Sequence, residues 1–149
     1  MIIDDHEISR AACRALLRTE GIDVVADVTA GDQAIADACA LRPDVAVVDV
    51  SPSASAGFGI ARRLRALPDP PAVVLTSSAE PAEFGGRLDG YCFVAKAGLC
   101  AKAIRDAAPW ASGSGCSDCD DRRPVPRRRL GRRPGRARRS CRPGRSRSC

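Results

Sequence analysis

The sequence has few aromatic residues and no long apolar run. Aromatic side chains make up 3% of its 149 residues, and tryptophan, tyrosine, methionine and histidine each occur once. No stretch of about 20 apolar residues is present, so no membrane-spanning helix is predicted. The N-terminus also lacks a basic region followed by an apolar one, which argues against a secretory signal. We therefore expect a cytoplasmic protein with no membrane partner.

The C-terminal part lacks lysine and almost all aliphatic residues. Residues 109–149 carry 13 Arg, no Lys and 3 Asp, whereas residues 1–108 carry 11 Lys or Arg and 15 Asp or Glu. The net charge of +6 therefore comes from the C-terminal part. Segments rich in Arg, Pro, Gly and Ser bury too little apolar surface to offset the entropy of ordering. We predict a folded domain over residues 1–108, long enough to bury a core, and a disordered tail over 109–149.

The eight cysteines are not spaced like a disulfide framework. Four of them lie in segments with helix or strand patterns, where a free cysteine acts as a small buried apolar residue: Cys13, Cys39, Cys92 and Cys100. In the tail, Cys116 and Cys119 have the spacing of half a zinc site. Because no second close pair follows, we expect no structural zinc site.

Strand and helix patterns alternate along residues 1–108. Short apolar runs predict strands over residues 1–4, 22–28, 44–50, 72–77 and 91–95. Apolar residues at helical spacing predict helices over residues 7–20, 31–41 and 57–67, and two more helices are expected over residues 81–88 and 99–108. Gly85 and Gly86 make the fourth helix the weakest. Such alternation with short links predicts an α/β domain, a parallel sheet with helices on both faces.

Charged residues stand at the ends of three predicted strands. Asp4 and Asp5 end the first strand, Asp49 is near the end of the third, and Lys96 follows the fifth. Ligands of open parallel sheets bind at the carboxyl ends of the strands, where these side chains would converge. Several carboxylates in one pocket need a cation, and their oxygens suit Mg²⁺. The alternative is that Asp4 and Asp5 only cap the first helix.

Five motifs occur in the order and near the spacing of a known family. They are IIDDH with Asp4 and Asp5, VVDV with Asp49, the glycine Gly57, VVLTS with Thr76, and FVAK with Lys96. Over roughly residues 1–108 the chain resembles the receiver domain of two-component response regulators. The DDH motif and the absence of proline after Lys96 are similar to the LuxR/NarL-type branch. The resemblance implies a flavodoxin-like, doubly wound sheet of five βα units with strand order 2-1-3-4-5.

The resemblance implies a phosphoacceptor signalling domain rather than an enzyme. Asp49 would take a phosphoryl group from a sensor histidine kinase, and Lys96 and Thr76 would bind the phosphoryl oxygens. Thr76 and Phe93 would form the conformational switch, which regulates transcription or a partner, with a homodimer possible on phosphorylation.

The resemblance also implies a bound Mg²⁺. Its ligands would be Asp4, Asp5 and Asp49 together with the backbone carbonyl of Ser51. His6, next to the acidic pair, is expected to be a loop residue rather than a ligand.

A LuxR-type regulator would continue into a helix-turn-helix output domain, and no such pattern follows residue 108. We hypothesise that the tail is a frameshift product, which the alternative reading frames of the gene would test. Two other interpretations stay open. The arginines could form an arm that binds nucleic acid without sequence preference, or the chain could be a stand-alone or inactive receiver. DNA binding is thus expected only if an output domain or the tail supplies it.

Overall fold

Five short parallel strands form the central sheet of the protein. The computed structural model describes residues 1–51 and 53–111. The strands are β1 (Ile2–Ile3), β2 (Asp27–Val28), β3 (Val45–Asp49), β4 (Ala72–Ser77) and β5 (Cys92–Ala95). Their order in the sheet is β2-β1-β3-β4-β5, and every pair is parallel. This order confirms the predicted flavodoxin-like fold.

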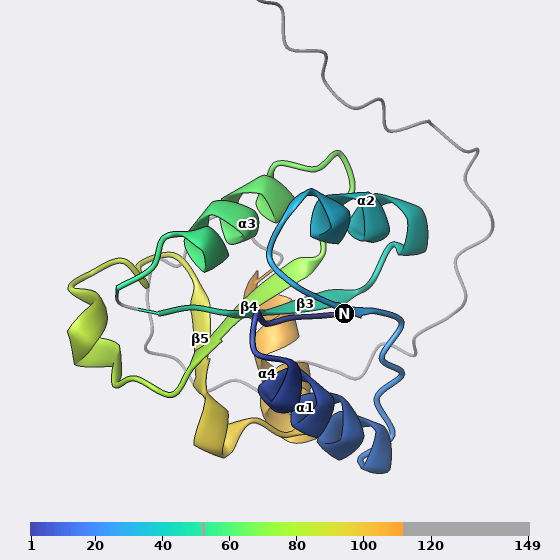
Figure 1. Ribbon diagram of the computed structural model, residues 1–149, viewed down its shortest axis with the longest axis horizontal. Coiled ribbons are helices and arrows are strands. Elements are labelled where there is room, and N and C mark those ends of the chain that lie inside the picture. The colour runs from blue at the N-terminus through green and yellow to red at the C-terminus, as the bar shows by residue number, and fades with distance from the viewer. Residues whose placement is uncertain (52, 112–149) are drawn as a thin grey trace, which may run out of the picture. The chain divides into compact units, whose positions relative to one another are not determined.

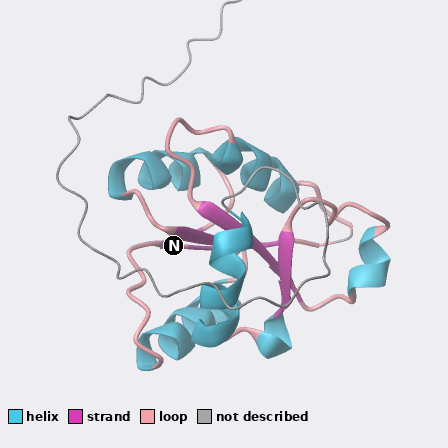
Figure 2. Cartoon of the chain, turned by 180° about the vertical axis from the view of Figure 1, so that it is seen from behind, coloured by secondary structure: helices cyan, strands magenta, loops and turns pink. Residues whose placement is uncertain are grey.

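Helices cover both faces of the sheet (Figures 1 and 2). They are α1 (Glu7–Thr19), α2 (Asp32–Leu41), α3 (Ala56–Arg65) and α4 (Ala101–Ala111). The helices α2 and α3 lie on one face, and α1 and α4 lie on the other (Figure 1). None of the described helices is both long and apolar enough to cross a membrane.

Alternating strand residues supply the two halves of the core. Side chains along a strand point alternately to opposite faces of a sheet. Accordingly, Ile3 and Val48 join the core under α2 and α3, whereas Ile2 and Val47 join the core under α1 and α4. Every residue of β4 is buried. The nearly continuous apolar runs of β3 and β4 are therefore explained by burial on both sides.

The predicted helix over residues 81–88 is wrong. The chain forms only a short 3₁₀ helix there, η1 (Pro81–Phe84). Gly85 and Gly86 have φ angles of 53° and 87°, a left-handed conformation that ends the helix and that glycine adopts without strain. The two glycines thus act as a stop signal, a stronger effect than the weakening expected from their helix propensity.

Other boundaries differ less. The second strand extends only over Asp27–Val28, and Ile22, its predicted first residue, is instead hydrogen-bonded to Leu17 at the end of α1. The last helix continues to Ala111, three residues beyond the predicted domain end. The predictions for residues 112–149, including disorder, Cys116, Cys119 and nucleic-acid binding by the arginines, lie outside the described residues.

Candidate functional site

The carboxyl edge of the sheet brings four of the predicted site residues together. Asp4 follows β1, Asp49 ends β3, Thr76 lies in β4, and Lys96 begins the 3₁₀ turn η2 (Lys96–Gly98) after β5. β1 and β3 are neighbours, and Asp49 is paired with Thr76 in the register of β3 and β4. The strand order alone therefore accounts for their convergence.

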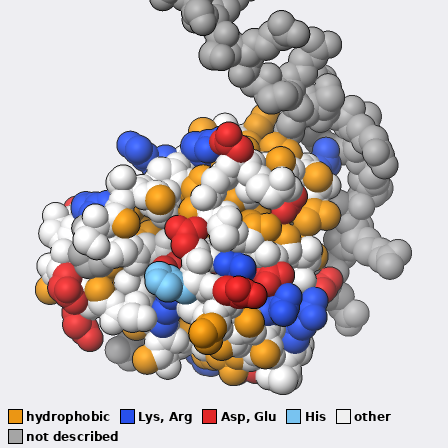
Figure 3. Space-filling view, viewed as in Figure 1, with side chains coloured by type: hydrophobic (Ala, Val, Ile, Leu, Met, Phe, Trp, Pro, Cys, Tyr) orange, Lys and Arg blue, Asp and Glu red, His pale blue; other side chains and the backbone are white. Residues whose placement is uncertain are grey.

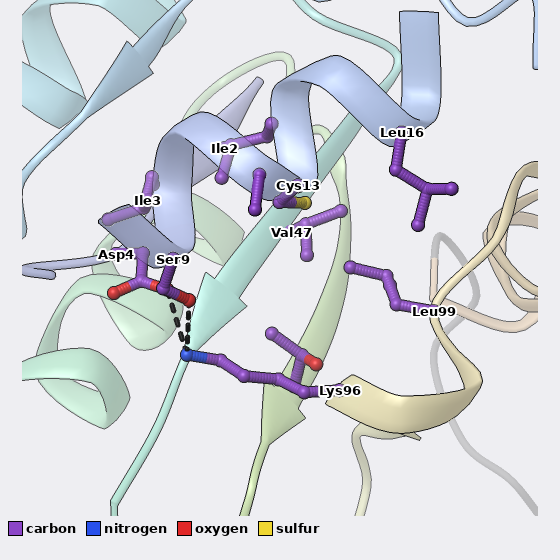
Figure 4. Close-up of a pocket in the computed structure, with 11 residues that line it drawn as sticks. Ile2, Ile3, Asp4, Ser9, Cys13, Leu16, Val47, Lys96 and Leu99 are labelled. Carbon is purple, nitrogen blue, oxygen red and sulfur yellow. Dashed lines mark hydrogen bonds and ion pairs between the residues drawn. The ribbon is translucent and has the colours of Figure 1, made fainter. Parts of the chain in front are cut away.

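Lys96 forms an ion pair with two carboxylates at once. Its Nζ lies 2.8 Å from Oδ2 of Asp4 and 2.9 Å from Oδ1 of Asp49. It also donates a hydrogen bond to Oγ of Ser9, on the first turn of α1, at 2.9 Å. Figure 4 shows the lysine stem running along the site to reach Asp4 and Ser9. Two carboxylates and one ammonium leave this trio with a net charge of −1.

Asp4 is a buried carboxylate held by three donors. Its side chain is 4% exposed and accepts hydrogen bonds from Lys96, from Oγ of Ser9 at 2.7 Å and from the backbone N–H of His6 at 2.8 Å. Burial alone would raise the pKa of Asp4, but the three hydrogen bonds outweigh it and hold the pKa below its ordinary value. Asp4 therefore stays ionised and fixes the position of Lys96.

Asp49 and Lys96 have pKa values above their ordinary ones for different reasons. Burial raises the pKa of Asp49, and the nearby Lys96 only partly offsets this effect. For Lys96, burial would lower the pKa, but its contacts with Asp4 and Asp49 outweigh burial and raise it. A half-buried carboxylate with an increased affinity for protons is a stronger nucleophile than an exposed one, and here it lies beside a fixed cation.

The contacts of Asp4 and Asp5 do not fit the alternative interpretation that the acidic pair only caps α1. The N-cap residue of α1 is His6, and its side chain makes no capping hydrogen bond. Asp4 bonds Lys96 and Ser9, as described above. Asp5 is exposed, and its Oδ1 accepts a hydrogen bond from the backbone N–H of Ala30 at 2.8 Å.

Within the described residues, one group of side chains could hold a metal ion. Ligand atoms of Asp4, His6 and Asp49 all lie within 4.8 Å of one another. Asp5 is not in this group, whereas His6, which was expected to be a loop residue rather than a ligand, is. His6 is 82% exposed, with Nδ1 3.6 Å from Oδ1 of Asp4, and Figure 3 shows it, the single histidine, at the surface near acidic side chains. Ser9 is not among the site residues predicted from the sequence, because its role becomes apparent only from its position on the inner side of the first turn of α1.

Thr76 has a buried hydroxyl with no hydrogen-bond partner in the part of the chain that the structure describes. Its side chain is 4% exposed, and Oγ1 makes no hydrogen bond to any described residue. A buried polar atom left unpaired costs about 1–3 kcal/mol, so such atoms often mark a place where a ligand supplies the missing partner. Oγ1 of Thr76 therefore fits an oxygen-rich ligand at this edge of the sheet.

Residues 1–96 match the family model described as "Response regulator receiver domain". The chain belongs to this family of two-component signalling domains. It is 35% identical to the DNA-binding transcriptional activator EvgA of Escherichia coli K12 over 65 residues, which cover 44% of this chain and 32% of EvgA. It is 31% identical to the transcriptional regulatory protein LiaR of Bacillus subtilis over 115 residues, 72% of this chain and 54% of LiaR.

Solved receiver domains share its fold. The signal receiver domain of a response regulator named NarL from Mycobacterium tuberculosis superposes with a TM-score of 0.59 at 26% identity, covering 76% of this chain and 94% of that domain. The receiver domain of a modulated diguanylate cyclase from Desulfovibrio desulfuricans G20 gives a TM-score of 0.58 at 26% identity, covering 74% and 90%. The chain spans between about a third and about half the length of the curated relatives EvgA and LiaR.

The predicted switch residues of the receiver lie on opposite faces of the sheet. Thr76 is paired with Val94, and Phe93 with Leu75, in the register of β4 and β5. The partly buried ring of Phe93 packs against Phe84, with 5.9 Å between ring centroids. The role of Phe93 as a rotating switch remains a prediction, and its present contact is with η1.

The donor atoms of the site fit a small divalent cation. Carboxylate oxygens of Asp4 and Asp49 are the hard ligands that Mg²⁺ prefers, and they would also neutralise its charge. The carbonyl of Ser51 follows β3 by two residues and accepts one backbone hydrogen bond, from Ala54 at 3.3 Å. Since a carbonyl oxygen has two lone pairs, this bond leaves Ser51 able to act as a ligand.

The site should make the stability of the protein depend on pH. Asp4 has a folded pKa below its unfolded value of about 4, so its stabilising contribution is present above that value and is lost as the pH falls through the folded pKa. The pKa of Asp49 is raised in the folded state, so protonation of Asp49 at low pH stabilises the fold. This effect on stability is opposite to that of Asp4.

We therefore expect Asp4→Asn to flatten the loss of stability between about pH 5 and pH 3, and Asp49→Asn to steepen it. Urea unfolding of the three proteins at several pH values in this range measures the slopes directly. Equal slopes in wild type and both variants would contradict the assignment of these two shifts.

Proposed function

We propose that this receiver domain accepts a phosphoryl group on Asp49 from a sensor histidine kinase, with Mg²⁺ bound beside it. The observation that supports the proposal most is the position of Lys96, whose ammonium lies between the carboxylates of Asp4 and Asp49. The unpaired hydroxyl of Thr76 lies on the neighbouring strand at the same register position as Asp49. A nucleophile, a fixed cation and a free donor at one sheet edge are the groups that phosphoryl transfer needs.

The transfer itself follows from these groups. A carboxylate oxygen of Asp49 attacks the phosphorus atom of a phosphohistidine, so that a P–O bond forms and the P–N bond breaks. The electron pair of the broken bond returns to the imidazole nitrogen, which takes up a proton. Lys96 and Thr76 stabilise the charge on the equatorial phosphoryl oxygens, while Asp4 keeps Lys96 in place.

Asp4, Asp49 and the carbonyl of Ser51 would hold the cation. When bound, Mg²⁺ neutralises negative charge on the phosphoryl oxygens. Asp5 would join this set only if its carboxylate left the N–H of Ala30. Asp5 is therefore a proposed ligand only in that rearranged state.

A transcriptional output is also part of the proposal, because the relatives EvgA and LiaR are named as transcriptional regulators.

The test is phosphorylation by acetyl phosphate, followed by intact-protein mass spectrometry. We expect an adduct of one phosphoryl group per chain with Mg²⁺ and none in excess EDTA, because without a cation the site has a net negative charge that repels the donor. Restoring Mg²⁺ after EDTA should restore the adduct. Equal modification with and without the cation, or no modification of the folded protein, would contradict the proposal.

A further inference from the structure

A cavity of about 210 Å³ lies between α1 and the sheet, behind the stem of Lys96. Its apolar walls are Ile2 and Val47 from the sheet, Ala12, Cys13 and Leu16 from α1, and Leu99 from the segment before α4. Figure 4 shows Leu16 and Leu99 at the end of this space that is farthest from Asp4 and Ser9. Leu16 is 42% exposed, so the cavity opens to solvent at that end. Its inner end borders the ion-paired edge where phosphorylation is proposed, and its outer end, at Leu16 and Leu99, lies away from that edge.

The inner end of the cavity is polar. Asp4, Ser9, Thr76 and Lys96 line it, and of these only the hydroxyl of Thr76 has no hydrogen-bond partner among the described residues. The charged groups there are already paired with one another and leave a net negative charge with Asp49. Without a bound cation an anionic ligand would be repelled, whereas a neutral hydroxyl group could pair with Thr76.

The walls stay apolar at neutral pH. Burial raises the pKa of the Cys13 thiol to about 11, so Cys13 is uncharged and acts as a small apolar group. An engineered apolar cavity of about 150 Å³ holds a benzene molecule, so the present cavity has room for one ring with a substituent.

We propose that this cavity binds a small neutral molecule of one-ring size that carries a hydroxyl group. The ring lies between Val47 and Leu99, and the hydroxyl forms a hydrogen bond with Oγ1 of Thr76. The proposed phosphorylation uses the same hydroxyl of Thr76, so the two ligands would compete for it. Binding of the neutral molecule requires neither Mg²⁺ nor a phosphoryl group, and the unphosphorylated protein without Mg²⁺ therefore tests it separately from phosphorylation.

The first experiment uses p-cresol as the probe and titrates it into the full-length chain, with backbone amide NMR shifts as the readout. Ala12→Leu places a larger side chain at a residue that lines the cavity, whereas the matched control Ala11→Leu changes an exposed alanine of α1 that does not line it. We expect Ala12→Leu to weaken binding by about tenfold or more and Ala11→Leu to change it by less than about twofold. No saturable shift in the wild type, or equal effects of the two variants, would overturn the proposal.

The second experiment tests the hydroxyl. Thr76→Val keeps the shape of the side chain, and since Oγ1 of Thr76 has no hydrogen-bond partner within residues 1–51 and 53–111, the variant should remain folded. The ratio of the affinities for p-cresol and toluene should fall by about fivefold from wild type to Thr76→Val, because one hydrogen bond is lost. An unchanged ratio would show that the polar end of the cavity does not recognise the ligand.

Discussion

Asp49→Asn is expected to abolish phosphorylation by acetyl phosphate completely. Asparagine has nearly the same shape as aspartate, but its amide is a poor nucleophile and cannot form an aspartyl phosphate. In the presence of Mg²⁺ we therefore expect the wild type to gain the mass of one phosphoryl group and Asp49→Asn to gain none. Intact-protein mass spectrometry measures both directly.

A matched control separates this effect from a general loss of carboxylates. Asp44 is an exposed aspartate just before the opposite end of the same strand, β3, and Asp44→Asn should be modified like the wild type.

Loss of the adduct through unfolding is not expected, because the raised pKa of Asp49 means that its charged form disfavours the folded state at neutral pH. Asp49→Asn should thus unfold at an equal or higher urea concentration. A phosphoryl adduct on Asp49→Asn would show that another residue is the acceptor.

The sheet could be predicted from the sequence because its signals are local. Uninterrupted apolar runs such as those of β3 and β4 occur where a strand is covered on both faces, and alternation with helical patterns then restricts the topology. The convergence of Asp4, Asp49 and Lys96 followed from the same reasoning, since parallel strands end at one edge. The structure confirms this convergence.

Side-chain directions could not be predicted in the same way. Asp4 and Asp5 are adjacent in sequence, yet the first turns inward to Lys96 and the second outward to the N–H of Ala30. This choice depends on how α1 leaves β1, which is a tertiary property. The role of Ser9 and the unpaired state of Thr76 depend on such orientations as well, and neither leaves a signal in the composition or the periodicity.

The failed helix at residues 81–88 has a different cause. Gly85 and Gly86 adopt positive φ angles, and the segment therefore stops after a single helical turn. The aromatic ring of Phe84 is nevertheless buried, where it packs against Phe58 and Phe93. The segment therefore contributes Phe84 to the core without forming the predicted helix.

Gly57→Ala should strongly destabilise this domain. A Cβ atom on Gly57 would approach the backbone carbonyl oxygen of Asp49 well inside 3.0 Å, a separation that real Cβ atoms essentially never show. Because the obstacle is backbone rather than a flexible side chain, α3 or the end of β3 must move. We expect a loss of about 2 kcal/mol or more, measured by urea unfolding.

Gly59 provides the matched control two residues further along α3. A Cβ there meets no atom within 4 Å, so Gly59→Ala should raise stability by about 0.5–1 kcal/mol through improved helix propensity. Two Gly→Ala changes in one helix are thus expected to differ in sign. Equal effects would mean that α3 is not pressed against β3 as described.

The same contact links the fold to the proposed chemistry. The carbonyl that Gly57 approaches belongs to Asp49 itself, and the loop between them contains Ser51, whose carbonyl is a proposed ligand of the cation. A shift of the end of β3 would move the Asp49 carboxylate relative to Lys96, 2.9 Å away. We therefore expect Gly57→Ala to lower the rate of acetyl phosphate modification even under conditions where circular dichroism shows the variant to be folded, while Gly59→Ala keeps the wild-type rate. A wild-type rate in folded Gly57→Ala would show that the site tolerates this displacement and that glycine is needed there for packing alone.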